Sequence, residues 1–377
     1  MMKIINERFT DLVSRYVEML DAVAYSNRVD LLHEKMIVFS ILTQGEGVDE
    51  NRVYNIFKKL KSEIIEVCNR KINSVSLFKG LCSIGISLHN SSNRYVDEET
   101  MDLVDLAIVK NMYLVADYVL FRDFNIDYFD CVSGLSGTIY YVARYCRDKI
   151  DNDKTISIIK MIMNSVIHQI QTSKNVAYGV AHGLVGIVRG CVEAFEMFAN
   201  DKWAVSQINY LKSKVMNDSC PMGDKVYWKD RMGGRIHRRR DWCTGNVGIL
   251  WMMSIVYQKM NDNKMELTML NKLCRELSFD EEGHFDDSIC HGRPGLLMLK
   301  LYYYTTKSKC RDRTRVTQEI AKELLTRKEL KWEPNILGDC YSDFILSAAV
   351  LGRANVIFEH LMLDDRKDKY ENCKFSI

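Results

Sequence analysis

Residues 182–187 read His-Gly-Leu-Val-Gly-Ile, a glycine-rich entry into an apolar run, and related segments recur along the chain. Five segments carry the pattern: 79–86, 133–139, 182–187, 244–249 and 291–297. Their leading glycines are Gly80, Gly134, Gly183, Gly245 and Gly292, at steps of 54, 49, 62 and 47 residues. Each step is long enough for two helices and their loops at a rise of about 1.5 Å per residue.

The repeats predict helical hairpins that stack on one another. Glycine at the entry to a helix allows unusual φ angles and close approach of neighbouring backbones. Such hairpins cannot bury their apolar faces alone, so they stack into a continuous core. Residues 343–350 lie at the next expected place with alanines instead of glycines, and we interpret them as a degenerate copy. If the repeats close into a ring, the residues just before the glycines converge on one rim: Asp130, His182, Cys243, Cys290 and His291.

The composition is that of a soluble globular protein with a large core. Only three prolines occur in 377 residues, which favours a mostly helical chain. A net charge of +2 gives no reason to expect nucleic acid as a partner. The N-terminus is charged too early for a signal peptide and no apolar run is long enough for a transmembrane segment, so we expect a cytoplasmic protein. The twelve cysteines are then expected to be reduced, and no Cys-x-x-Cys pair suggests a thioredoxin-like site.

Two regions outside the repeats are also interpretable. Apolar residues at helical spacing predict helices over 5–25, from Asp30 onwards and over 53–67, with the second ended by 44–47. The segment 219–241 lacks this periodicity, and its glycines predict a loop or a short β-hairpin with a glycine turn. This insertion is basic and leads directly into Cys243, so we expect it to border the site.

Cys243, Cys290 and His291 each lie within two residues of a leading glycine and are candidate ligands of one zinc ion. Three protein ligands leave a fourth position open, which is typical of catalytic rather than structural zinc. Two thiolates and a neutral imidazole cancel the charge of Zn²⁺, so a substrate thiolate in the fourth position would retain nucleophilic character. The pattern therefore indicates a site that activates a thiol.

The repeated Gly-x-x-Gly segments together with Ala181-His182-Gly183, Trp242-Cys243-x-Gly245 and Cys290-His291-Gly292 resemble the lanthionine synthetase C family, the LanC cyclases. The resemblance covers roughly residues 78–350. It implies an all-α fold, a double-layered α/α toroid (barrel) forming a single domain over 1–377. It also implies a zinc-dependent cyclase that adds peptide cysteine thiols to dehydroalanine or dehydrobutyrine and forms lanthionine or methyllanthionine rings in a lanthipeptide.

The resemblance also implies roles for individual residues. The zinc ligands correspond to Cys243, Cys290 and His291, and the acid/base histidine corresponds to His182. The family's aspartate, arginine and tryptophan correspond to Asp130, Arg239 and Trp242. Thr244 departs from the family pattern, because a histidine or tyrosine usually follows the first cysteine ligand. The implied partners are a dehydrated precursor peptide, a dehydratase and an exporter, with the enzyme peripheral to a membrane-associated complex.

Simpler structural roles remain open for several of these residues. His182 is also compatible with a helix-capping or core histidine, and Asp130 with a helix N-cap. Arg239 is also compatible with a solvated basic loop, and spacing alone favours it over Arg240. Two further functions stay open for the whole chain. One is a LanC-like glutathione transferase acting on dehydroamino acids in proteins, and the other is a non-catalytic peptide-binding toroid.

Overall fold

The structure is a computed structural model of the chain. It describes residues 2–23, 31–44, 49–70, 74–120, 125–172, 176–223, 225–278, 288–306, 311–326 and 342–363. The contacts divide the chain into two compact units. Unit 1 comprises Met1–Asn69, Ser83–Asp102 and Gly283–Ile377, and unit 2 comprises Arg70–Cys82 and Leu103–Glu282. The predicted single domain over 1–377 stays a prediction.

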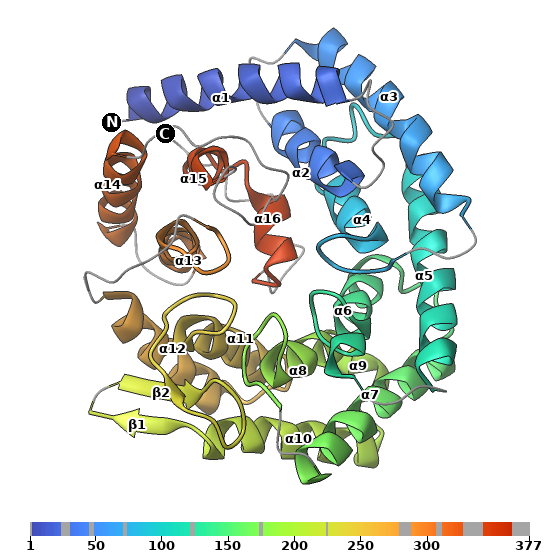
Figure 1. The fold of residues 1–377 in the computed structure, drawn as a ribbon, viewed down its shortest axis with the longest axis vertical. Coiled ribbons are helices and arrows are strands. Elements are labelled where there is room, and N and C mark those ends of the chain that lie inside the picture. The colour runs from blue at the N-terminus through green and yellow to red at the C-terminus, as the bar shows by residue number, and fades with distance from the viewer. Residues whose placement is uncertain are drawn as a thin grey trace. The chain divides into compact units, whose positions relative to one another are not determined.

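The predicted all-α fold is confirmed in both units (Figure 1). Most of α5 lies in unit 2 and most of α4 in unit 1. The helices of unit 2 are α5 (Glu98–Leu120), η2 (Ile126–Tyr128), α6 (Leu135–Tyr145), α7 (Asn152–Thr172), α8 (Leu184–Glu193), α9 (Phe195–Phe198), α10 (Lys202–Asn217), α11 (Asn246–Lys259) and α12 (Asn263–Ser278). Those of unit 1 are α1 (Met2–Val23), α2 (Leu32–Thr43), α3 (Glu50–Cys68), α4 (Leu81–His89), α13 (Arg293–Thr306), α14 (Arg311–Thr326), α15 (Ser342–Val350) and α16 (Asn355–His360).

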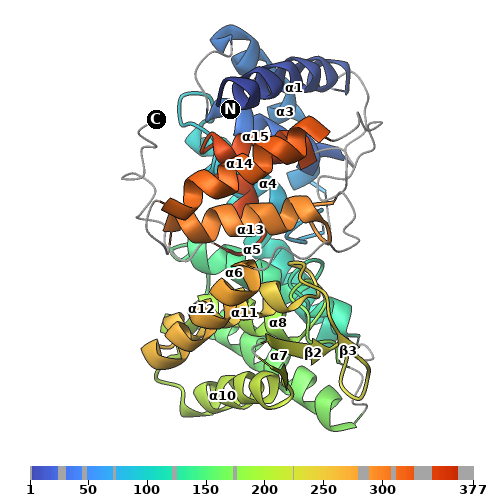
Figure 2. The same ribbon diagram turned by 90° about the vertical axis from the view of Figure 1, so that its left-hand side faces the viewer.

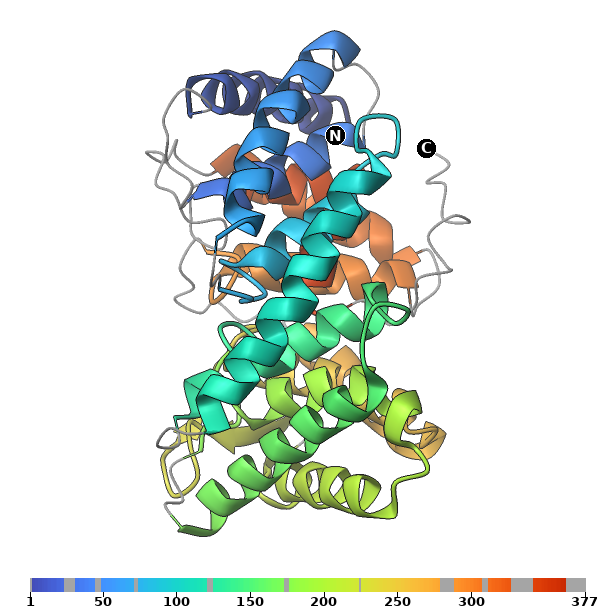
Figure 3. The ribbon, with the colours of Figure 1, turned by 90° about the vertical axis from the view of Figure 1, so that its right-hand side faces the viewer.

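Unit 2 has the two helical layers that the repeats predict. α6, α8 and α11 each begin directly after a leading glycine and are buried along nearly their whole length. They pack α6 on α8 and α8 on α11, and the outer helices α7, α10 and α12 pack against them in turn. The outer helices bury only one face, as amphipathic helices do. Two outer helices, α5 in cyan and α7 in green, are seen in Figure 3.

The second glycine of the repeated motif is required for close packing. A Cβ atom at Gly186 would collide with the carbonyl oxygen of Val180 in the loop that precedes the same helix. Gly137, Gly248 and Gly295 stand equally close to their own loops. The expected unusual φ angles are wrong for these glycines, because the described glycines with positive φ all lie elsewhere. The motif glycines therefore serve close approach rather than backbone conformation.

Unit 1 is formed by the helices from the two ends of the chain. α1 packs on α15, where the rings of Phe9 and Phe344 stack with centroids 5.5 Å apart. α13 packs on α14, as Figure 2 shows. The helices predicted over 5–25, from Asp30 and over 53–67 correspond to α1, α2 and α3. The segment interpreted as a degenerate repeat forms α15, which confirms its helical structure.

The insertion in unit 2 is a small antiparallel sheet, which confirms the predicted hairpin. Its strands are β1 (Cys220–Met222), β2 (Lys225–Lys229) and β3 (Ile236–His237), in the order β1-β2-β3. Gly223 and Gly233 take positive φ in the connections, which glycine tolerates best. The Trp228 indole N–H donates to the carbonyl of Val215 and ties β2 to α10. Among the described residues, no helix is long and apolar enough to span a membrane.

Candidate active site

The loops that lead into the repeat helices share a capping residue. In four of them a serine or aspartate lies four residues before the leading glycine: Ser76, Asp130, Asp241 and Ser288. The Oδ1 atom of Asp130 accepts from the amides of Ser133 (2.6 Å) and Gly134 (3.0 Å). The single oxygens of Ser76 and Ser288 accept from the amide three residues later, at 3.1 and 3.0 Å. Each loop is thus held in the same turn ahead of its helix.

This common register gives the candidate residues equivalent positions. Cys243 and Cys290 both lie two residues before a leading glycine, and His182 and His291 both lie one residue before. Thr244 occupies the same position as the two histidines in its own loop. Its hydroxyl donates to the Asp241 carboxylate at 3.2 Å, so Thr244 completes a cap where the loops of His182 and His291 carry imidazoles.

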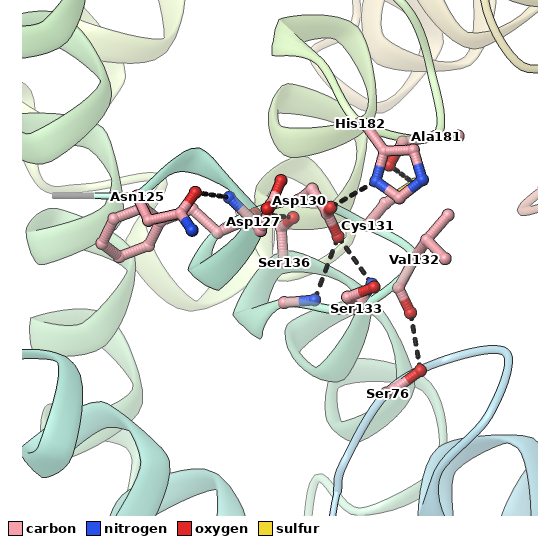
Figure 4. Close-up of polar contacts among 12 residues, drawn as sticks. Ser76, Asn125, Asp127, Asp130, Cys131, Val132, Ser133, Ser136, Ala181 and His182 are labelled. Atoms are coloured by element: carbon pink, nitrogen blue, oxygen red, sulfur yellow. Dashed lines mark hydrogen bonds and ion pairs between the residues drawn. The ribbon is translucent and has the colours of Figure 1, made fainter.

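His182 and Asp130 form a close pair within unit 2 (Figure 4). The Nδ1 atom of His182 lies 2.6 Å from Oδ2 of Asp130, while Oδ1 is occupied by the two amides. A carboxylate only accepts hydrogen bonds, so Nδ1 carries the proton and Nε2 is the basic nitrogen in the neutral ring. The His182 side chain is 56% exposed, whereas the Asp130 side chain is fully buried. Asp130 is therefore both the cap and the orienting partner of His182.

A third carboxylate lies beside this pair. Asp127, an exposed residue of η2, has a carboxylate oxygen within 4.8 Å of the ligand atoms of Asp130 and His182. Its own amide donates to Oδ1 of Asn125, which fixes the start of η2. The His182 imidazole therefore lies beside two carboxylates, those of Asp130 and Asp127.

Cys243 is buried in unit 2 and is joined to the His182 loop through its main chain. Its carbonyl oxygen accepts from the amides of Val180 (2.8 Å) and Ala181 (3.1 Å). The neighbouring Trp242 is 1% exposed, and its ring lies 5.8 Å from that of Phe78. Trp242 is thus part of a buried aromatic contact, and its predicted catalytic role stays a prediction.

The two arginines before Cys243 differ in their surroundings. Arg240 is buried, and its guanidinium donates to the carbonyl of Glu276 in α12. Arg239 is exposed, and its carbonyl accepts from the amide of Asn246 at 3.0 Å. The side chain of Arg240 is thus engaged in the core, and the catalytic role predicted for Arg239 stays a prediction. No contact links Arg239 to the pair of His182 and Asp130 within the described residues.

Cys290 and His291 lie in unit 1, immediately before α13. Both are half-buried, and the Cys290 Sγ atom is 3.8 Å from the His291 Nε2 atom. Two ligands of one tetrahedral zinc ion, at about 2.3 Å for sulfur and about 2.0 Å for nitrogen, are about 3.5 Å apart. The spacing of these neighbouring side chains is therefore that of two ligands of one metal ion.

Two residues near the pair were missed by the reasoning from sequence. Cys131 is buried with its Sγ atom 2.9 Å from the carbonyl oxygen of Val180. Burial raises the pKa of its thiol well above the usual value. Asp241 repeats the capping geometry of Asp130, with amides at 2.6 and 2.9 Å. Aligning the repeats on their leading glycines would have shown the shared aspartates.

Comparison with known proteins agrees with this architecture. The family described as lanthionine synthetase C-like protein matches residues 40–342, most of the chain. No curated protein matches the sequence. Among solved structures, a nisin cyclase is similar, with a TM-score of 0.71 and 16% identity, covering 94% of this chain and 98% of that one. At this identity the likeness shows the fold, which is the helical toroid that the family resemblance implies. The chain belongs to the lanthionine synthetase C-like family.

Proposed function

We propose that this chain is a zinc-dependent cyclase. It adds a cysteine thiol of a peptide to a dehydroalanine or dehydrobutyrine of the same peptide and closes a lanthionine or methyllanthionine ring. Membership of the lanthionine synthetase C-like family supports the reaction class. The chain also shares its fold with a protein named nisin cyclase, which supports the view that this scaffold is suited to the reaction.

The observation that carries the proposal is the pair of His182 and Asp130. A half-exposed imidazole is held at 2.6 Å by a fully buried carboxylate, whose other oxygen is fixed by two backbone amides. This arrangement orients the ring so that Nδ1 holds a proton and Nε2 is the basic nitrogen. A histidine held in this way suits general acid–base catalysis, because imidazole exchanges protons near neutral pH.

Ring closure needs one proton to be removed and one to be delivered. The thiol sulfur forms a bond to the β-carbon, and the π electrons of the alkene move towards the α-carbon and its carbonyl group. The thiol proton is taken by His182 at Nε2, and His182 returns a proton to the α-carbon. The reaction is an isomerisation, so no oxidant, reductant or co-substrate is required.

The donor set fits zinc. Cys243, Cys290 and His291 would hold the ion, and the separation of 3.8 Å between the last two side chains is compatible with ligation of one metal. When bound, zinc would lower the pKa of a coordinated substrate thiol and so activate it as a nucleophile. Sulfur and imidazole donors of this kind favour zinc over magnesium or calcium, which take oxygen ligands.

The remaining site residues have supporting roles in the proposal. The exposed Arg239 would hydrogen-bond the oxygen on which negative charge develops during addition. Trp242 would keep the segment around Cys243 packed through its buried ring. The substrate is a precursor peptide already dehydrated at serine and threonine, which requires a dehydratase partner. An exporter complex at the membrane is the further partner.

The proposal is tested by ring closure in a dehydrated, cysteine-containing peptide. Because cyclisation leaves the mass unchanged, free thiols are counted by alkylation and mass spectrometry after incubation with zinc-loaded protein. We expect thiols to disappear with the wild type and to persist with His182→Ala, which should retain its zinc. His168→Ala is the matched control, since His168 is an exposed histidine of α7.

Two outcomes would contradict the proposal. If the wild type consumes no peptide thiols but transfers added glutathione to the same peptide, the activity is that of a thiol transferase. If neither reaction occurs while the peptide binds, the chain is a peptide-binding protein without catalysis.

A further inference from the structure

The loop that carries His182 lacks the side-chain cap of its neighbours. Four residues before the leading glycine, the other loops have serine or aspartate, whereas this loop has Gly179. A Cβ atom at Gly179 would come within 2.8 Å of the carbonyl oxygen of Cys243 and 3.3 Å of the Cα atom of Thr244. The close approach of that backbone excludes a capping side chain, so the His182 loop has to be fixed from outside.

In the two residues before His182, Val180 and Ala181, both the N–H groups and the carbonyl groups have hydrogen-bond partners. The amides of Val180 and Ala181 donate to the Cys243 carbonyl, at 2.8 and 3.1 Å. The carbonyl oxygens of the same two residues face the thiol of Cys131, at 2.9 and 3.4 Å. The single S–H hydrogen is shared between these two acceptors, and the thiol is fully buried.

Cys131 is next in sequence to Asp130, which fixes the other end of the same histidine. Figure 4 shows Asp130 and Cys131 on one loop and Ala181 and His182 on the adjacent one. Asp130 holds the imidazole by Oδ2, and Cys131 holds the main chain from which the imidazole projects. Two consecutive residues thus set both the direction of the ring and the position of its backbone.

The sulfur of Cys131 has little freedom to leave this position. A Cβ atom at Gly186 would lie 2.9 Å from it, so the second motif glycine of the next repeat leaves just enough room for the thiol. In the other four loops, the residue three before the leading glycine is apolar and buried: Leu77, Val180, Trp242 and Ile289. Packing at this position is met by large apolar side chains in the other loops, and a thiol is found there only in the Cys131 loop.

We propose that Cys131 is a positioning residue for His182, acting through thiol hydrogen bonds to the carbonyl groups of Val180 and Ala181. The role rests on the proposed function in so far as His182 is the acid/base group. Without the thiol, the His182 backbone loses one of its two lateral restraints. Displacement of a catalytic group by about 1 Å is enough to lower a rate by about 100-fold.

The test compares Cys131→Val and Cys131→Ser with the wild type. Valine has a similar size and matches the apolar residues of the other loops, but it cannot donate, whereas serine retains a donor. We expect Cys131→Val to fold with wild-type zinc content and to lose about 10- to 100-fold in kcat with little change in KM. We expect Cys131→Ser to recover most of that loss.

A second readout is independent of catalysis. Nitrogen NMR of labelled histidines reports the tautomer of the His182 ring. We expect the Nδ1–H tautomer in the wild type and in Cys131→Ser, and a mixture of tautomers in Cys131→Val. If Cys131→Val keeps both the wild-type tautomer and the wild-type kcat, Cys131 does not position His182. If the wild type closes no rings, the proposed function fails, while the tautomer shift still decides the positioning role.

Discussion

Replacing Asp130 by asparagine separates the two tasks that its carboxylate performs. One oxygen caps the loop by accepting the amides of Ser133 and Gly134, and the other accepts the Nδ1 proton of His182. Asparagine keeps an oxygen for the cap but presents an NH₂ group to the imidazole. Because two donors cannot face each other, the ring has to shift its proton to Nε2, and the basic nitrogen then points at residue 130.

The two effects differ greatly in size. Aspartate and asparagine cap helices about equally well, so Asp130→Asn should change the free energy of unfolding by about 1 kcal/mol or less. A correctly positioned acid/base group accelerates reactions by about 10²- to 10⁴-fold, so we expect kcat for ring closure to fall by this factor. Asp130→Ala should in addition destabilise the protein by about 1–3 kcal/mol, because the buried amide of Gly134 and the part-buried amide of Ser133 lose their acceptor.

Asp241→Asn provides the matched control. Asp241 is buried like Asp130 and accepts two amides at nearly the same distances, but its partner is the hydroxyl of Thr244 instead of an imidazole. Both variants should unfold at similar temperatures in circular dichroism. Their rates of thiol loss should differ by at least about tenfold, with Asp130→Asn the slower. Equal rates in the two variants would refute the special role of the carboxylate beside His182.

Two buried groups make further predictions about stability. Burial opposes the charge of Glu193, but Arg189, Arg144 and Lys259 outweigh it and hold its pKa at about 2, below the ordinary 4.5. The ionised carboxylate therefore stabilises the fold by about 3 kcal/mol, fully above pH 4.5 and progressively less as the pH falls towards 2. Glu193→Gln should lower the free energy of unfolding, measured by urea titration, by about 3–5 kcal/mol at pH 7 and by much less at pH 3. An equal loss at both pH values would contradict this. Burial lowers the pKa of His360 to about 4 from 6.5, so its contribution is complete above pH 6.5 and is lost as the pH falls towards 4. His360→Gln, which does not titrate, should flatten the dependence of stability on pH between these values, and an unchanged slope would argue against a neutral, buried His360.

The repeat architecture was predictable because it depends on glycine spacing. A second glycine three residues after the first marks a helix start whose first turn touches its own loop, and the steps between glycines predict the hairpins. The same register predicted which residues lie just before each helix, among them His182 and Cys243. The explanation of the glycines was half correct, since close approach is observed at Gly186 and an unusual φ is not.

The contacts of individual side chains were less predictable. Asp130 was interpreted as either a helix cap or a catalytic residue, and the structure gives it a capping oxygen and an oxygen for His182. In the sequence, Cys131 cannot be told from a small residue of the core. Its hydrogen bonds become visible only from the positions of the carbonyl groups of Val180 and Ala181. Spacing along a loop also does not indicate the direction of a side chain, which is why Arg239 and Arg240 had to be distinguished by burial.

Zinc X-ray absorption of the purified protein, with and without a dehydrated cysteine peptide, tests the central claim most directly. The claim is that Cys243, Cys290 and His291 hold one zinc ion whose fourth position takes the substrate thiol. We expect two sulfur neighbours at about 2.3 Å and nitrogen or oxygen neighbours at about 2.0 Å without peptide, and three sulfur neighbours with peptide. A protein that binds no zinc, or a sulfur count that the peptide leaves unchanged, would contradict the account.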